Sequence, residues 1–302
     1  MAFRHTPYDG SKRPFTVGLE PVDVSRWLDP DGHLVVHLKR KAELLETVHS
    51  RVFRAESGTE AAQREVLDLI LEDLAAHHRA THSVSSDVVE VLNDGPRVRL
   101  TDYAPLEAAS RLVQEDLVLM RKGEDGYRLA AASLCFPSSW SLAEKFGRSM
   151  HAIHDNVPGF NDGRMGPVVA RIFDNLTADQ LVGRYNWSIY DDPDLHHPQA
   201  KQLAPQIEEK GAGALAHLFV RVERQTLRRL PKSGDILFTI KIHHDPISLL
   251  KTHERGAELA AGLAAQLREL DDRQIAYKGL TQYRTAIAEE LETFAPSAPE
   301  AV

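Results

Sequence analysis

Apolar residues recur at helical spacing in the first third of the chain. Residues 42–52 and 59–79 carry them three and four positions apart, as Val66, Ile70 and Leu74 illustrate. Such a spacing places apolar side chains on one face of a helix. The pattern therefore predicts a helical N-terminal layer.

From residue 116 the pattern changes to short apolar runs separated by turn residues. Asp125-Gly126 between the first two runs is typical of a hairpin, and Pro231 and Gly234 separate the last two. The runs predict five strands, at residues 116–121, 127–136, 184–190, 217–227 and 235–243. We expect an α+β fold, a five-stranded antiparallel sheet with helices on one face, and this order of elements is that of a PAS domain.

Three more helices are predicted within and after the sheet region. The first, at residues 141–154, begins with Ser141 and Glu144 in capping-box spacing. Two long helices follow the last strand, at residues 247–270 and 274–294.

Both ends of the chain are polar or rich in Pro and Ala. We therefore expect a flexible N-terminus at residues 1–15, one domain over residues 16–294 and a disordered tail at residues 295–302. The first residues lack an apolar segment, and no run approaches the roughly 18 to 20 apolar residues that cross a bilayer. We expect a cytoplasmic protein that does not bind a membrane.

Composition narrows the chemistry. The formal net charge of -8 disfavours nucleic acid as a partner, because its phosphates attract clustered Lys and Arg. Cys135 is the single cysteine, which excludes an internal disulfide and any cysteine-rich zinc or iron–sulfur site. A redox cofactor would have to be held in another way.

The helix predicted at residues 141–154 carries a candidate metal ligand. On a wheel at about 100° per residue, His154 lies within the apolar face, together with Phe146, Gly147 and Met150. A haem needs an imidazole aimed at its iron, a flat apolar slot and little bulk beside the ring, which these four residues could provide. A hydrogen-bonded core histidine would show the same pattern.

A basic residue stands on the apolar face of the fourth predicted strand. Alternation from His217 places Arg224 on that face, where an unpaired guanidinium would cost several kcal/mol. Its partner could be a haem propionate, an iron-bound oxygen or an acidic residue such as Asp235.

The third predicted strand offers candidates on both faces. Tyr185 and Trp187 share its apolar face and could line a pocket for a small amine, whose cationic form favours aromatic rings; they could equally be core residues. Arg184 lies on the opposite face and is a further candidate for cofactor binding.

An ordered series of short segments runs through about residues 15–277. The segments are Gly18-Leu19-Glu20-Pro21 with Trp27-Leu28, Val113-Gln114-Glu115-Asp116-Leu117, Cys135-Phe136-Pro137-Ser138-Ser139-Trp140 with Lys145-Phe146-Gly147, Ile153-His154-Asp155-Asn156-Val157-Pro158, Arg184-Tyr185-Asn186-Trp187-Ser188, and Glu223-Arg224-Gln225-Thr226-Leu227-Arg228-Arg229-Leu230-Pro231 before Ile236-Leu237-Phe238-Thr239-Ile240. Taken together, the series resembles the haem-dependent oxidative N-demethylase alpha-subunit-like family.

The resemblance implies a PAS-like domain that has become an enzyme. Haem b, reduced by an external donor such as NAD(P)H through a flavin or iron–sulfur reductase partner, would use dioxygen to oxidise an N-methyl group of a small secondary amine such as dimethylamine, releasing formaldehyde. Carried over by position, the histidine of the Ile-His-x-x-Val-Pro segment is His154, the expected iron ligand. Arg224 would anchor a propionate or assist bound oxygen as a catalytic residue.

One segment departs from the family pattern. Phe238-Thr239-Ile240 is followed by Lys241-Ile242-His243-His244, where family members often read Arg-Thr-Tyr. This difference leaves room for a substrate other than dimethylamine.

Two alternative functions stay open. A haem-based PAS sensor would use the same fold without catalysis, because fold does not dictate function. A non-haem metal enzyme would draw on His77-His78, His196-His197 or His243-His244-Asp245. Neighbouring histidines on a strand point to opposite faces, so each pair would offer one ligand at most.

Overall fold

The structure, a computed structural model, describes residues 2–201, 203 and 215–294. The tail expected at residues 295–302 lies outside this described part. In chain order the first elements are β1 (Glu20–Pro21), η1 (Val24–Arg26), α1 (Leu34–Thr47), α2 (His49–Val52), β2 (Phe53–Ala55), α3 (Glu60–His77), β3 (His82–Val84), β4 (Val88–Val91), β5 (Arg97–Arg99), η2 (Leu100–Asp102) and α4 (Pro105–Ser110). The others are β6 (Asp116–Gly123), β7 (Gly126–Ser133), α5 (Leu142–Lys145), α6 (Met150–Ile153), α7 (Met165–Asn175), β8 (Leu181–Tyr190), β9 (Phe219–Arg229), β10 (Ile236–Pro246), η4 (Ile247–Thr252), α9 (Gly256–Glu269), α10 (Asp272–Tyr277) and α11 (Arg284–Glu292).

The main sheet has seven strands in the order β1-β8-β9-β10-β6-β7-β2, and all its neighbours are antiparallel. The five predicted strands form its continuous middle, and the α+β class and the helical N-terminal layer of α1 to α3 are confirmed. β1 and β2, of two and three residues, extend the sheet beyond the five strands expected. A separate sheet of β3, β4 and β5 was not predicted either. Strands this short show no alternation in the sequence.

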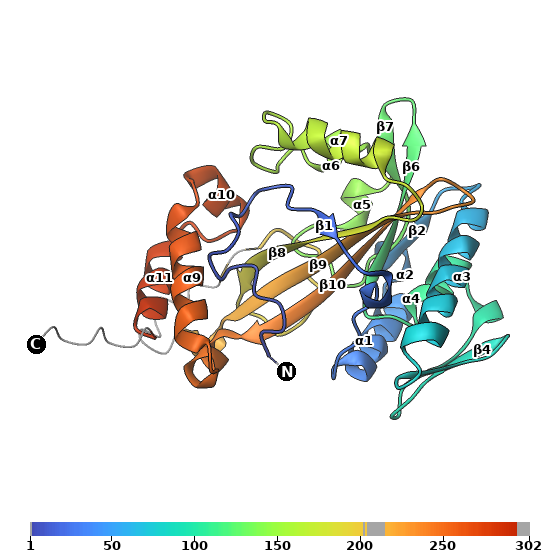
Figure 1. The fold of residues 1–302 in the computed structure, drawn as a ribbon, viewed down its shortest axis with the longest axis horizontal. Coiled ribbons are helices and arrows are strands. Elements are labelled where there is room, and N and C mark those ends of the chain that lie inside the picture. The colour runs from blue at the N-terminus through green and yellow to red at the C-terminus, as the bar shows by residue number, and fades with distance from the viewer. Residues whose placement is uncertain (1, 202, 204–214, 295–302) are drawn as a thin grey trace, which may run out of the picture.

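Helices cover both faces of the main sheet, so the expectation of helices on one face was wrong (Figure 1). We name the faces by one helix each. On the α9 face, Leu237 packs with α3 and α4, and Val222 packs with α9 and α11. On the α7 face, Ile236 and Ile240 pack with α5 and α7. β10 is apolar at its even positions from Ile236 to Ile242, whereas on the α9 face Leu237 is followed by the buried polar residues Thr239, Lys241 and His243.

The helix predicted at residues 141–154 is instead two short helices, α5 and α6, separated by a break. Gly147 has a φ of +76°, and its N–H donates to the carbonyl of Leu129 in β7 at 2.9 Å. The N–H of Leu129 donates back to Arg148 at 3.1 Å. This pairing with β7 replaces helical hydrogen bonds, so a single wheel does not describe the segment. The capping box of Ser141 and Glu144 is present, and it begins the four-residue α5.

The two long C-terminal helices expected are each divided. Residues 247–270 form η4 and α9, and residues 274–294 contain the end of α10 and α11. A second capping box, between Asp271 and Gln274, begins α10, and Gly279 follows it with a φ of +65°. That conformation favours glycine and ends the helix.

Residues 2–15 form no helix or strand but are packed against the domain. Phe3 is 6% exposed and Tyr8 is fully buried. The side chain of Gln266 in α9 donates to the carbonyls of Pro7 at 3.3 Å and Lys12 at 2.8 Å. The expectation of a flexible N-terminus did not foresee this packing, because turn-rich polar sequence carries no periodicity.

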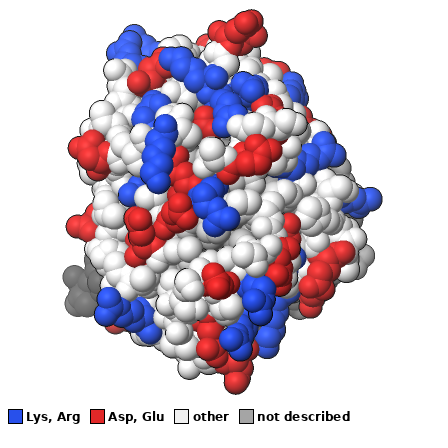
Figure 2. All heavy atoms as spheres, turned by 90° about the vertical axis from the view of Figure 1, so that its right-hand side faces the viewer, with Lys and Arg blue, Asp and Glu red and all other residues white. Residues whose placement is uncertain are grey.

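Charges of both signs are interspersed on the side of the molecule that carries α3 and the second sheet (Figure 2). Among the described residues some charges are paired across elements, as Arg128 is with Glu56 at 2.6 Å. The described residues on this side present no basic stripe of the kind that binds nucleic-acid phosphates. None of the described helices combines the length and apolar character needed to cross a membrane.

Candidate functional site

His154 follows α6 and lies over the α7 face of the sheet. Its Nδ1 lies 2.8 Å from the carbonyl oxygen of Met150, and its ring stacks on Phe160 with the centroids 4.0 Å apart. A neutral imidazole that donates from Nδ1 to a carbonyl has a free lone pair on Nε2. This backbone bond is also what commonly orients a metal-bound histidine. The side chain is therefore arranged to offer Nε2 as a ligand.

The imidazole of His154 is neutral at ordinary pH. Burial lowers its pKa to about 4; the bond to Met150 opposes this shift, and the charges of Lys145 and Arg184 add to it. A histidine must be neutral to bind a metal. His154 meets this condition without needing a proton to be removed.

Two cations beside His154 lack a full set of partners. Nε of Arg184 is buried and has no hydrogen-bond partner among the described residues. Burial lowers the pKa of Lys145 to about 8, and its Nζ lies 4.4 Å from the ring centre of Trp140. Because a buried, incompletely paired cation is unfavourable, this part of the site is suited to an anion.

One carboxylate belongs to the same cluster. Glu223 is 7% exposed and accepts hydrogen bonds from Gln225 at 2.7 Å and Asn186 at 3.3 Å. Its charge opposes the lowering that burial imposes on the pKa of Arg184 and of Lys145. The cluster around His154 therefore holds the carboxylate of Glu223 beside the cations Arg184 and Lys145.

Apolar side chains of the His154 segment and of the sheet pack against the core on the α7 face. Phe146, Met150 and Ile153 from the helical segment, and Val182 and Phe238 from the sheet, are partly buried at the edge of the core cluster. Haem combines a flat apolar ring with two carboxylates and an iron that takes a neutral imidazole. The neutral His154, the unpartnered Nε of Arg184 and this apolar border fit such a group.

Gly147 does not contribute as expected. It is exposed, and a Cβ built on it would meet no atom within 4 Å. A glycine is favoured at this position because the break between α5 and α6 has a positive φ. Close packing of a haem ring against a helix is not the reason.

Arg224 lies on the other face of the sheet. The β8–β9 register pairs Arg184 with Gln225 and Tyr185 with Arg224, so the two arginines point to opposite faces. Arg224 is 6% exposed and donates to the carbonyl of Trp27 at 2.8 Å and to that of Arg26. The expectation that it shares a haem site with His154 was therefore wrong, and Asp235 pairs with Arg121 rather than with Arg224.

Tyr185 and Trp187 also lie on the α9 face. Trp187 is 3% exposed, and its indole N–H donates to Gln266 at 2.8 Å. The ring of Tyr185 lies 4.9 Å from that of His5. The sheet separates both aromatic residues from His154, so they cannot line the same pocket.

The adjacent histidines His243 and His244 point to opposite faces of the sheet, as expected for a strand. β10 register places His243 on the α9 face and His244 on the α7 face. His244 packs against Phe219 with the ring centres 4.5 Å apart. The two histidines cannot contribute ligands to one site.

We expect His244 to lower the free energy of unfolding when the solution is made acidic. Burial lowers its pKa to about 3, with the charges of Arg221 and His197 adding to this. Below pH about 6.5 the unfolded chain binds a proton that the folded chain does not, so the free energy of unfolding falls by up to about 1.4 kcal/mol per pH unit on acidification. We expect His244→Gln to reduce this slope in urea unfolding at pH 7, 6 and 5. An unchanged slope would contradict the assignment.

A pocket of about 500 Å³ opens beside the His154 segment. It lies between residues 15–17, Pro158 and Gly159, and residues 271–274, with Asp162 and Arg273 paired at 2.8 Å on its border. Neither His154 nor Arg184 lines it. The candidate site therefore rests on the side chains of the α7 face, not on this pocket.

Three members of the site were not predicted. Lys145 was not selected because it lies outside the apolar face of a wheel that treats residues 141–154 as one helix. Phe160 follows α6 in a turn-rich stretch without periodicity. Glu223 alternates with Gln225 on the face opposite Arg224, and that alternation of polar residues was a usable signal.

The comparison with known proteins agrees with the resemblance of the sequence. Residues 18–288 match the family described as haem-dependent oxidative N-demethylase, alpha subunit-like. The match covers most of the 302 residues and includes every residue of the site on the α7 face. The chain belongs to the haem-dependent oxidative N-demethylase alpha-subunit-like family.

Proposed function

We propose that this protein binds haem b through Nε2 of His154 and oxidatively N-demethylates a small secondary amine. One N-methyl amine, one dioxygen, two electrons and two protons would give the demethylated amine, formaldehyde and water. When bound, haem supplies the reductive activation of dioxygen. The observation that carries the proposal is the neutral His154, held through Nδ1 by Met150, next to Arg184 with its unpartnered Nε.

The surrounding residues have distinct roles in this proposal. Arg184 and Lys145 hold the propionate carboxylates, because they are cations with incomplete pairing in a partly buried site. Phe146 and Met150 exclude water from the ring. Glu223 attracts the ammonium form of the amine, since it is the buried carboxylate of this cluster.

The arrangement of strands supports a PAS-like haem domain. The five predicted strands, numbered along the chain, stand in the order third, fourth, fifth, first, second across the sheet. The helical segment between the second and third carries His154 over one face. We propose that this core, extended by the short edge strands and by α9 to α11, is the cofactor-binding unit.

Electrons must come from outside the chain. The sequence offers one cysteine, Cys135, which is buried, and an iron–sulfur cluster needs several thiolates. The family name, alpha subunit-like, supports a partner subunit. We propose that a flavin or iron–sulfur reductase, supplied by NAD(P)H in the cytoplasm, delivers the electrons.

The test begins with the visible spectrum of protein expressed with ample haem precursor, recorded ferric and then dithionite-reduced with carbon monoxide. We expect a Soret band that shifts with carbon monoxide, and formaldehyde release when dimethylamine, dioxygen and a reducing system are added. A protein that stays colourless after haem reconstitution would refute the haem proposal. Haem binding without turnover across a panel of N-methyl amines would favour a sensor.

The two arginines on opposite faces provide a matched comparison. We expect Arg184→Met to weaken haem affinity about tenfold, because it removes one charge-assisted contact to a propionate. Arg224→Met should lower the stability of the protein and leave the haem affinity of the folded fraction unchanged. Haem titration followed at the Soret band, with urea unfolding of each variant, separates the two effects. Equal loss of haem affinity in both variants would contradict the assignment of faces.

A further inference from the structure

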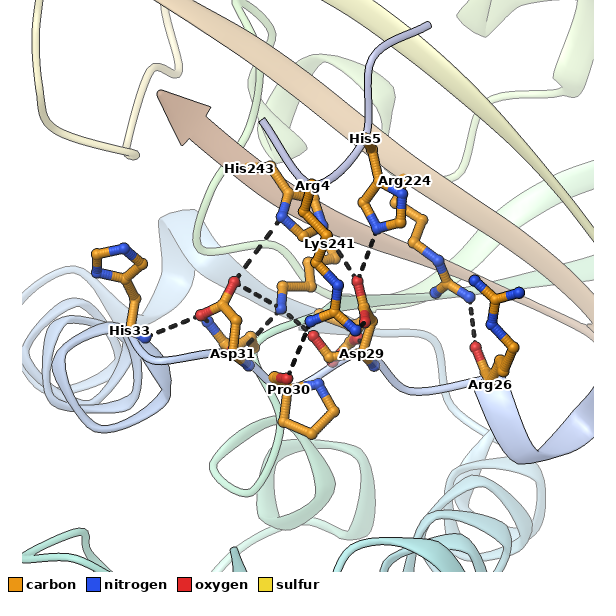
Figure 3. Close-up of polar contacts among 12 residues, drawn as sticks. Arg4, His5, Arg26, Asp29, Pro30, Asp31, His33, Arg224, Lys241 and His243 are labelled. Atoms are coloured by element: carbon orange, nitrogen blue, oxygen red, sulfur yellow. Dashed lines mark hydrogen bonds and ion pairs between the residues drawn. The ribbon is translucent and has the colours of Figure 1, made fainter. Parts of the chain in front are cut away.

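Three potential metal ligands converge on the α9 face, on the opposite side of the sheet from His154. His5 comes from the N-terminal segment, Asp29 precedes α1, and His243 lies on β10; one donor atom from each lies within 4.8 Å of the others (Figure 3). Nε2 of His5 lies 2.9 Å from Oδ2 of Asp29, and Nε2 of His243 lies 3.3 Å from the same oxygen. All three side chains are largely buried, with 12%, 9% and 6% of their surface exposed.

The two separations, 2.9 and 3.3 Å, are close to those between donors of one metal coordination shell. Donors at about 2.0–2.1 Å from a tetrahedral zinc ion lie about 3.3 Å from each other. Nε2 of His243 makes no well-aligned hydrogen bond among the described residues, although the side chain is 6% exposed. A buried nitrogen held only by the poorly aligned contact with Asp29 is incompletely satisfied, and a metal ion between the three residues would satisfy it.

A second carboxylate stands behind His243. Oδ2 of Asp31 lies 3.8 Å from Nδ1 of His243, on the side of the ring away from Asp29 (Figure 3). At 3.8 Å the carboxylate is beyond hydrogen-bond distance, but its charge favours the tautomer with the proton on Nδ1, which leaves Nε2 of His243 free to bind a metal. Asp31 is itself held by Lys241 at 2.9 Å and by Gln114 at 2.9 Å.

We propose that His5, Asp29 and His243 bind one divalent first-row transition-metal ion, of which Zn²⁺ is the probe to use. Two imidazoles and one carboxylate are ligands that suit such ions. The ion lies apart from the haem, because the sheet separates the two sites, and the proposal does not depend on haem binding. It fastens the N-terminal segment, through His5, to the loop before α1 and to β10.

Arg4 competes with the ion for Asp29. Its guanidinium pairs with Oδ1 of Asp29, and its side chain is 44% exposed, so it can move into solvent. Lys241 and Arg224 are also close, but both donate to main-chain carbonyls, those of Asp29 and Trp27. Removing Arg4 should therefore tighten metal binding, which a cluster held together only by hydrogen bonds would not show.

The test is zinc binding to the full-length protein after treatment with a chelator, measured by competition with a zinc-sensitive dye. We expect one Zn²⁺ per wild-type chain, at least tenfold weaker binding in His5→Ala and Asp29→Asn, and severalfold tighter binding in Arg4→Ala. His33→Ala is the matched control, because His33 is an exposed histidine nearby and should bind zinc as the wild type does. Zinc should raise the Tm of the wild type and of His33→Ala but not that of His5→Ala.

The zinc titrations distinguish a metal site from a cluster held together only by hydrogen bonds. No zinc bound by the wild type, or equal affinity in wild type, His5→Ala and Asp29→Asn, would overturn the proposal. Asp29→Asn keeps His5 and a side chain of the same shape, so weak binding in both variants cannot be assigned to a detached N-terminal segment alone. The Soret band of the same samples reports haem independently, so a failed haem proposal would leave the zinc result valid.

Discussion

Replacing His154 by alanine is expected to remove most of the bound haem. The variant loses the nitrogen that we assign to the iron, and an alanine offers no replacement ligand. We expect the ratio of Soret to protein absorbance to fall at least tenfold, or the band to shift to that of a differently ligated haem. The measurement is the ferric and carbon monoxide spectrum of protein purified from cells supplied with haem precursor.

His151→Ala is the matched control for this variant. His151 lies in α6, three residues before His154, with 74% of its side chain exposed and Asp155 at 4.0 Å. It tests whether loss of any histidine in α6 disturbs the segment. Retention of haem by His154→Ala, or equal loss in His151→Ala, would reject His154 as the ligand.

The central strands could be predicted because each carries its own pattern. β6 and β7 are joined by Asp125-Gly126, and β9 and β10 by a turn with Pro231 and Gly234, so the boundaries are marked locally. β1 and β2 have no such pattern and exist because β8 and β7 offer them a free edge. Edge pairing of this kind depends on tertiary contacts, which alternation does not reveal.

The candidate site shows the same limit. His154 was singled out on a helical wheel, yet the structure breaks that helix where Gly147 pairs with Leu129 of β7. Alternation of apolar and polar residues predicted on which face of its own strand each arginine lies. The register between the strands, which pairs Arg184 with Gln225, is needed to show that Arg224 and Arg184 lie on opposite faces of the sheet. Registers and helix breaks are set by partners distant in sequence, so these two errors had the same physical source.

Replacing Asp116 by alanine is expected to cause the largest loss of stability. Asp116 is fully buried and accepts the N–H groups of Cys135 at 2.9 Å and Phe136 at 2.7 Å. Nζ of the buried Lys41 lies 3.9 Å away. The alanine variant leaves the two N–H groups without their acceptor and removes the charge opposite Lys41, which keeps the carbonyls of Val113 and Glu115 as acceptors. We expect a loss of about 3–5 kcal/mol. Urea unfolding at pH 7 measures this loss.

Asp174→Ala gives the contrasting case, because Asp174 pairs with Lys122 at 2.6 Å while 51% of its side chain is exposed. Removal of such a surface pair costs about 0–1 kcal/mol. A similar small effect for Asp116→Ala would contradict the role of Asp116 as the buried link between β6 and the chain after β7. The backbone that Asp116 holds leads through Trp140 into α5 and α6, the segment that precedes His154. We therefore expect Asp116→Ala to bind haem more weakly as well as to be less stable.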